Sequence, residues 1–201
     1  MVKAITFDLD GVYFPNGKAN FLKALHGFGV SQDEAKRVFL KSDEMNNRYK
    51  VGKMSDEEYW MWAIKEWRLQ LSPREIIELL ISSYDVSLKV EGMAKTARRR
   101  GYKTMICSNN FPARVNGLQK RFGFLDNFDA GVFSYEVGAT KPAEVMFTEL
   151  VRRSGVEPSK IAFADDNEVN LAGAKSVGIT AFLYEDFDKF VRDLGLLGVK
   201  L

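Results

Sequence analysis

Helical stretches and short apolar runs alternate through the second half of the chain, and this alternation restricts the fold more than any other feature. From Lys89 onward, a helix ending at Arg100 precedes an apolar run at 102–107. Further helical stretches and apolar runs follow as 113–122 and 129–133, 143–153 and 161–164, and 168–177 and 179–184. This order predicts a doubly wound α/β domain, with parallel strands and helices on both faces of the sheet.

Residues 17–85 show only helical patterns and interrupt the alternation directly after a first strand near the N-terminus. Helix starts are indicated at Ser31, Ser55 and Ser72, because each serine has a glutamate three positions later, as in a capping box. Apolar residues recur at helical spacing at Phe21, Leu22, Leu25 and Phe28, and again at Tyr59, Trp62, Ala63 and Trp67. We therefore predict a core domain formed by residues 1–16 and 86–201, and a small helical bundle of its own formed by residues 17–85.

Composition excludes several classes of function. The 201 residues are 46% apolar, which is enough for a substantial core. The 29 basic and 27 acidic residues leave a net charge of +2 with interspersed signs, so nucleic acid is not expected as a partner. The chain has no leader-like start and no run of 18 apolar residues, so we expect no membrane association and a cytoplasmic location. Both a monomer and a homodimer fit the sequence.

The single cysteine and the single histidine restrict the chemistry further. One cysteine, Cys107, allows no internal disulfide and no cysteine-built metal site, and its apolar surroundings favour a buried structural thiol. His26 lies in a helical stretch without evident partners, so a serine–histidine–aspartate triad lacks its base.

Two carboxylates, Asp8 and Asp10, stand one residue apart at the end of the first strand. Gly11 allows the chain to turn sharply there, so both acids are expected at the carboxyl end of the sheet, where open α/β folds bind ligands. Two such acids in close contact need a cation between them or a proton on one of them. The alternative is a strand end with two solvated acids.

Polar residues also follow the other strands. Ser108 and Asn109 come after the run at 102–107, and Lys141 precedes a helix that Pro142 can open. Asp165 and Asp166 follow the run at 161–164, and Asn170 lies one helical turn later. Ordinary helix capping explains Ser108 and Asn109 equally well, and solvent exposure is usual for a lysine. Oxygen ligands without histidine or cysteine favour Mg²⁺ over zinc.

These stretches together resemble the haloacid dehalogenase-like (HAD) hydrolases, most of which are phosphatases. FDLDGV at residues 7–12 is similar to their motif I, Ser108 falls in motif II, Lys141 in motif III, and Asp165, Asp166 and Asn170 in a DDxxxN form of motif IV. The match departs from the common pattern after Lys141–Pro142, where Ala143 and Glu144 replace an aspartate and a proline. The resemblance implies a Rossmann-like core with residues 17–85 as a helical cap.

The resemblance also implies a Mg²⁺-dependent phosphatase for a small phosphorylated metabolite. Asp8 would attack phosphorus to give an aspartyl-phosphate, and Asp10 would act as acid and base with a pKa raised by its acidic neighbours. Ser108, Asn109 and Lys141 would bind the phosphoryl group. Asp8, Asp10 and Asp166 would hold the metal, Asp10 through its backbone carbonyl. Asp165 would bind it directly or through water, and Asn170 would contact these ligands without binding the metal itself.

The same motifs are also compatible with other functions. The presence of Asp10 argues against the family's dehalogenase branch, whereas a phosphomutase needs the same four motifs. A non-catalytic HAD-fold protein that binds phosphate or a partner is a further alternative. Within the cap, Trp60, Trp62 and Trp67 are candidates for the substrate pocket or for the cap's own core.

Overall fold

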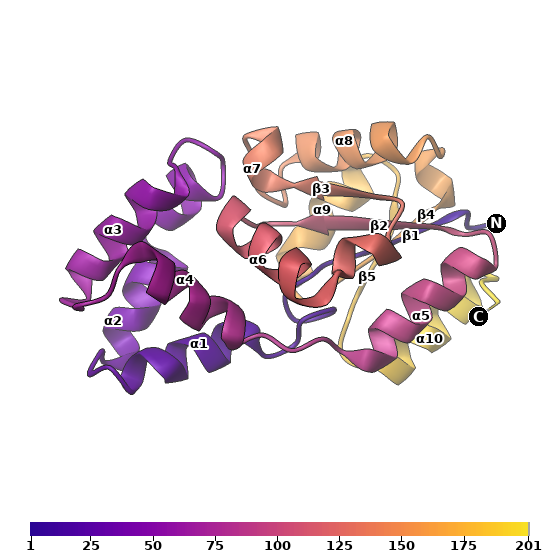
Figure 1. Cartoon of the computed structure of the whole chain (residues 1–201). Helices are drawn as coiled ribbons and strands as arrows, with labels where there is room; N and C mark the ends of the chain where they lie inside the picture. The colour runs from indigo at the N-terminus through magenta and orange to yellow at the C-terminus, as the bar shows by residue number, and fades with distance from the viewer. Residues whose placement is uncertain (201) are drawn as a thin grey trace.

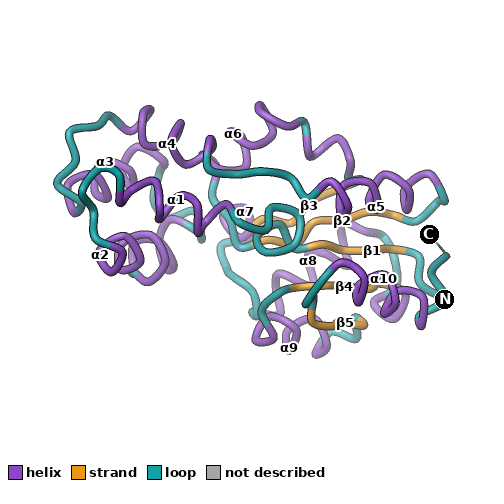
Figure 2. The backbone as a smooth tube through the Cα atoms, turned by 90° about the horizontal axis from the view of Figure 1, so that it is seen from below, coloured by secondary structure: helices purple, strands orange, loops and turns teal. Residues whose placement is uncertain are grey.

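The core of the computed structural model, which describes residues 1–200, is a five-stranded parallel sheet in the order β3-β2-β1-β4-β5. Figure 2 shows the strands side by side in this order, with β1 at the centre. The strands are β1 (Ala4–Phe7), β2 (Lys103–Ser108), β3 (Ala130–Phe133), β4 (Ile161–Asp165) and β5 (Thr180–Leu183). The predicted doubly wound α/β class is confirmed.

Helices cover both faces of the sheet, because alternate strand residues point to opposite sides. Ile5 and Phe7 of β1 belong to one buried cluster, whereas Ala4 belongs to the other. Helices α8 and α9 contact one face, and α5, α6 and α10 lie on the other (Figure 1). The helices of the core are α5 (Leu88–Arg99), α6 (Pro112–Phe122), α7 (Ser134–Val137), α8 (Glu144–Ser154), α9 (Glu168–Ser176) and α10 (Phe187–Leu196), with short 3₁₀ turns at Phe124–Asn127 and Pro158–Lys160.

The segment between β1 and α5 is entirely helical and stands to one side of the sheet (Figure 1). It contains α1 (Gly17–His26), α2 (Gln32–Lys36), α3 (Asp56–Glu66), α4 (Pro73–Ser82) and two π-helical segments, η1 (Arg37–Lys41) and η2 (Glu44–Tyr49). The three capping boxes form at Ser31, Ser55 and Ser72. Phe28 departs from the predicted pattern: α1 ends at His26, and Phe28 is 50% exposed.

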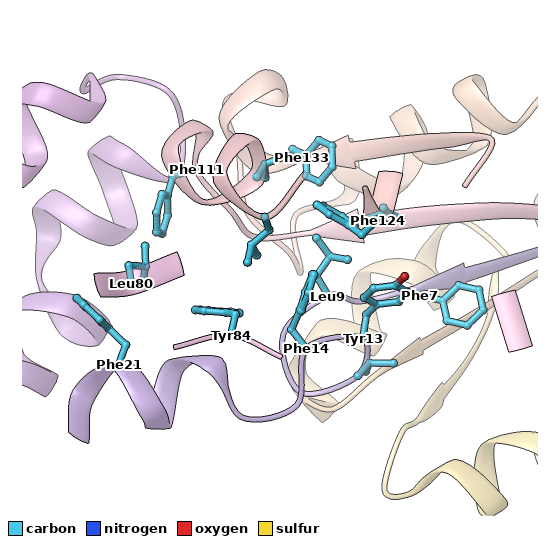
Figure 3. Close-up of a cluster of buried hydrophobic side chains, with 14 of the residues drawn as sticks. Phe7, Leu9, Tyr13, Phe14, Phe21, Leu80, Tyr84, Phe111, Phe124 and Phe133 are labelled. Atoms are coloured by element: carbon cyan, nitrogen blue, oxygen red, sulfur yellow. The ribbon is translucent and has the colours of Figure 1, made fainter. Parts of the chain in front are cut away.

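The apolar core of this helical segment, called the cap below, is continuous with that of the sheet. Figure 3 shows buried side chains that run from Phe21 and Leu80 through Tyr84 and Phe14 to Phe7. Phe111, which precedes α6 of the core domain, stacks on the cap residue Tyr49 with ring centroids 4.6 Å apart. The prediction of helices alone is correct, but the bundle shares its core with the sheet instead of enclosing one of its own. Within residues 1–200, every helix is too short or too polar to cross a lipid bilayer.

Candidate active site

Three carboxylates meet where β1 and β4 end. Asp8 directly follows β1, and the parallel register that pairs Phe7 with Ala164 places it beside Asp165, the last residue of β4. Asp8, Asp165 and the next residue, Asp166, each offer a carboxylate oxygen, and these oxygens lie within 4.8 Å of one another. This all-oxygen donor set fits a hard divalent cation such as Mg²⁺.

Lys141 is buried among these acids. Its Nζ donates to Asp165 Oδ2 at 2.6 Å and to the carbonyl of Cys107 at 2.8 Å, and it forms an ion pair with Asp8 Oδ1 at 3.0 Å. Since an ammonium group has three N–H donors, these three acceptors fix its position fully. The solvent-exposed lysine that the sequence left open as an alternative is therefore not observed.

Asp165 has little capacity left for a metal. Its Oδ1 accepts hydrogen bonds from the backbone N–H of Asn167 and from Asn170 Nδ2, both at 2.9 Å, and its Oδ2 accepts from Lys141. The fully buried carboxylate thus orients Lys141, and Asn170 orients the carboxylate.

Burial raises the pKa of Asp8 well above its usual range. Lys141 opposes this effect, whereas Asp165 and Asp10 add to it. Burial and the neighbouring Asp165 also raise the pKa of Asp166. Both protein contacts of the Asp8 carboxylate reach the same oxygen: the N–H of Leu9, at 2.7 Å, and Lys141 both bind Oδ1. The site therefore favours additional positive charge near Asp8, and among the described residues no hydrogen bond or ion pair reaches its Oδ2.

The side chain of Asp10 contacts cations. Its Oδ2 lies 2.7 Å from Arg114 Nη2 and 3.1 Å from Lys18 Nζ, and the Tyr84 hydroxyl donates to its Oδ1 at 3.4 Å. Burial acts to raise the pKa of Asp10, but Arg114 and Lys18 outweigh it and lower that pKa. The predicted elevation by acidic neighbours is wrong, because the nearest charges are positive.

Arg114 is a buried residue in contact with the site that the sequence analysis missed. It is 1% exposed, and besides Asp10 it donates to the Tyr84 hydroxyl at 2.9 Å and to Asn110 Oδ1 at 2.7 Å. A signal was present, since Arg114 stands three residues after Phe111 and four before Leu118, within the apolar stripe of α6. A charged residue on such a stripe needs a buried partner.

Ser108 and Asn109 lie at the end of β2, as predicted, and their side chains form hydrogen bonds with other residues of the protein. Ser108 is fully buried, and its hydroxyl accepts from Asn110 Nδ2 at 3.4 Å. The Asn109 side chain binds the backbone of Lys141 twice: Oδ1 accepts from the N–H at 2.7 Å, and Nδ2 donates to the carbonyl at 3.2 Å. Asn109 thus ties the lysine loop to β2.

A polar cavity of about 420 Å³ opens over these groups, with walls from both the core and the cap. The core supplies Asp8, Asp10, Asn109, Thr140, Lys141, Pro142, Asp166, Asn167, Val169 and Asn170, and the cap supplies Lys18, Asn46, Asn47 and Lys50. A larger groove of about 930 Å³ between α4 and α6 is mostly apolar and contains none of the motif residues. The cavity over the carboxylates is therefore the site that we assign to chemistry.

The cap tryptophans, Cys107 and His26 take no part in this cavity. Trp60 and Trp67 are buried and Trp62 is partly buried, all packed against the apolar cluster of the cap. Burial raises the pKa of the Cys107 thiol to about 12, consistent with a structural thiol. His26 lies in the exposed last turn of α1.

Gly11 gives a test of the Asp166 position. Its φ is +79°, and a Cβ atom there would lie 1.9 Å from Asp166 Oδ2. Gly11→Ala is expected to displace this carboxylate and weaken Mg²⁺ binding, measured by calorimetry, by roughly 10-fold or more. Gly29→Ala is the matched control, since Gly29 has a similar φ of +84° but no atom within 4 Å of the new Cβ. Equal Mg²⁺ affinity in both variants would remove Asp166 from the ligand set.

The family model of the haloacid dehalogenase-like hydrolases matches residues 2–178. The chain therefore belongs to this family, and the parallel sheet with acidic groups at its carboxyl edge is the fold of an HAD-like hydrolase. It is an enzyme of the hydrolase class, as the sequence predicted.

Phosphatases are among its relatives. The chain is 26% identical to ribulose-1,5-bisphosphate 5-phosphatase of Halopiger xanaduensis, over 92% of this chain and 85% of that protein. It is 23% identical to D-ribitol-5-phosphate phosphatase of Bacteroides thetaiotaomicron, over 98% of each. A crystal structure of an HAD family enzyme from Bacteroides thetaiotaomicron, in complex with magnesium and inorganic phosphate, superposes with a TM-score of 0.75 at 21% identity, over 94% of this chain and 99% of that one.

Proposed function

We propose that the chain is a Mg²⁺-dependent phosphatase that hydrolyses a small phosphorylated metabolite through an aspartyl-phosphate intermediate. The observation that carries this proposal is the convergence of Asp8, Asp165 and Asp166 around the buried Lys141, at the floor of a polar cavity. Two relatives whose names specify sugar phosphates or polyol phosphates support it.

Asp8 is the proposed nucleophile. Because Leu9 and Lys141 hold Oδ1, Oδ2 attacks phosphorus, and the bond from phosphorus to the alcohol oxygen breaks. An alkyl leaving oxygen takes its proton from Asp10, whereas an aryl group can leave as the phenolate. Lys141 stabilises negative charge on the phosphoryl oxygens. Ser108 and Asn109, at the end of β2, are the other proposed contacts of the phosphoryl group: the Ser108 hydroxyl accepts a hydrogen bond but still has its own proton to donate, and Asn109 Nδ2 has a second N–H.

Asp8, Asp166 and the backbone carbonyl of Asp10 would hold the Mg²⁺ ion. When bound, the ion supplies positive charge that offsets the carboxylates and the phosphoryl oxygens. We assign Asp165 to contact through water, because its two oxygens already accept three hydrogen bonds, including those from Lys141 and Asn170.

Asp10 is the proposed base, although a lowered pKa also makes its carboxylate a weaker one. Its lowered pKa favours the ionised form, which can take a proton from the water that hydrolyses the aspartyl-phosphate. The same charge makes proton donation to the leaving oxygen harder. We therefore expect esters with good leaving groups, such as aryl phosphates, to be hydrolysed fastest.

The proposal is tested by measuring the hydrolysis of 4-nitrophenyl phosphate and a panel of sugar phosphates with Mg²⁺ and after exhaustive chelation. Phosphate release that requires Mg²⁺ is expected. Full activity after chelation would contradict the metal assignment. A product that is isomerised but keeps its phosphate would indicate a phosphomutase, and phosphate binding without any turnover would indicate a binding protein.

A further inference from the structure

The wall of the cavity that belongs to the cap carries charges that the four motifs do not include. Lys18 comes from the first turn of α1, and Asn46, Asn47 and Lys50 come from η2 and its C-terminal end. These side chains line the same cavity as Asp8 and Asp166 but come from the helical segment, so we expect them beside the alcohol part of a phosphate ester whose phosphorus is attacked by Asp8.

Lys50 is held in place without a carboxylate partner. Its Nζ donates to Asn46 Oδ1 at 3.0 Å, and Asn46 is fixed in turn because its Nδ2 donates to the carbonyls of Leu40 and Ser42 at 2.9 and 3.1 Å. Among the described residues, no carboxylate forms an ion pair with Lys50. The neighbouring cations Lys18 and Arg114 already bind Asp10.

The other cations of the site are matched by acids. Lys141 lies between Asp8 and Asp165, and Arg114 lies against Asp10. Lys50 is therefore a partly buried positive charge without a counterion, close to two further cations. Burial, together with Lys18 and Arg114, lowers its pKa to about 7, while Asp10 acts in the opposite direction. An anion from a ligand would relieve this repulsion.

We propose that Lys50, supported by Asn46 and Lys18, binds a second anionic group on the substrate. The substrate is then a small phosphate monoester whose alcohol part carries a carboxylate or another phosphate. This inference rests on the proposed phosphatase function. The cavity of about 420 Å³ restricts the substrate to a small molecule, and its lining includes no aromatic side chain on which a nucleobase would stack.

The test compares three esters of similar size whose far end is negative, neutral or positive: phosphoglycolate, 2-hydroxyethyl phosphate and phosphoethanolamine. We expect kcat/KM to fall in that order in the wild type, with roughly 10- to 100-fold between the first two. Ethane-1,2-diol bisphosphate replaces the carboxylate by a second phosphate and shows which of the two anions the site prefers.

Lys50→Met is expected to lower the ratio of kcat/KM for phosphoglycolate to kcat/KM for 2-hydroxyethyl phosphate by a similar factor. Comparing the two proteins ester by ester cancels the intrinsic reactivity of each compound. Lys50→Arg keeps the charge and should retain most of the preference. Lys53→Met is the matched control, because Lys53 is exposed and lies three residues away.

Binding separates this inference from the proposed function. The three esters are also titrated calorimetrically, with Mg²⁺, into Asp8→Asn and into the double variant Asp8→Asn, Lys50→Met, so that affinity is measured without turnover. The same order of affinity in Asp8→Asn, and its loss in the double variant, is expected. Hydrolysis of all three esters with no dependence on charge or on Lys50 would overturn the anion subsite while leaving the phosphatase intact. Charge-dependent affinity without hydrolysis in the wild type would support the subsite and contradict the phosphatase.

Discussion

Replacing the Asp8 carboxylate by an amide, Asp8→Asn, is expected to lower kcat for 4-nitrophenyl phosphate by about 10⁴-fold or more. An amide is a poor nucleophile for phosphorus, and it removes one negative charge from the proposed metal site. Asp33→Asn is the matched control, since Asp33 is exposed on α2. Steady-state kinetics with Mg²⁺ measures both variants.

Binding of a phosphoryl mimic tests the same assignment without turnover. Beryllium fluoride, which mimics a phosphoryl group on an aspartate, should bind the wild type in the presence of Mg²⁺ and not bind Asp8→Asn. Normal turnover by Asp8→Asn would place the nucleophile elsewhere. Anion binding that persists in the variant would move the phosphoryl site away from β1.

Arg114→Met is expected to lower the free energy of unfolding more than any of the other substitutions. It leaves the buried Asp10 carboxylate with Lys18 as its remaining cation, and removing one partner of a buried ion pair costs about 3–5 kcal/mol. For a chain of this length, Tm should fall by roughly 10 °C. Lys120→Met, an exposed position on the same helix, is the control and should change Tm little.

The pH dependence of this difference follows from the lowered pKa of Asp10. A carboxylate with a lowered pKa in the folded state contributes stability above its unfolded pKa, and this contribution is lost as the pH falls through the folded pKa. Thermal unfolding from pH 7 down through the acidic range should therefore show the gap between wild type and Arg114→Met narrowing. A constant gap over that range would indicate that Arg114 stabilises the fold by packing on Phe111 and Tyr84 and not through the charge of Asp10.

The sequence by itself determined the class of fold and the motif residues of the site. Both are encoded locally: apolar runs alternate with helical stretches, and the polar residues stand directly after strands. Because parallel strands all end at one edge of the sheet, Asp8, Asp165 and Asp166 meet there without further information, whereas Lys141 comes from the loop between α7 and α8. The capping boxes at Ser31, Ser55 and Ser72 are local in the same sense, and all three formed.

The tertiary structure alone decided how these groups are charged and what they contact. Asp10 binds Arg114, which is 104 residues away, so neighbouring acids in the sequence do not set its pKa. The Asp165 carboxylate accepts a hydrogen bond from Lys141 Nζ, and the Asn109 side chain accepts one from the backbone N–H of that lysine.

The cap, too, combines features that the sequence predicted with contacts that only the folded chain shows. Its capping boxes were readable in the sequence, but the stacking of Tyr49 on Phe111 and the position of Lys50 over the carboxylates depend on how two distant segments pack. The sequence gives the type of each ionisable side chain. Its counterion and its burial, which determine what that charge does, are properties of the packed chain, because they come from segments that meet only after folding.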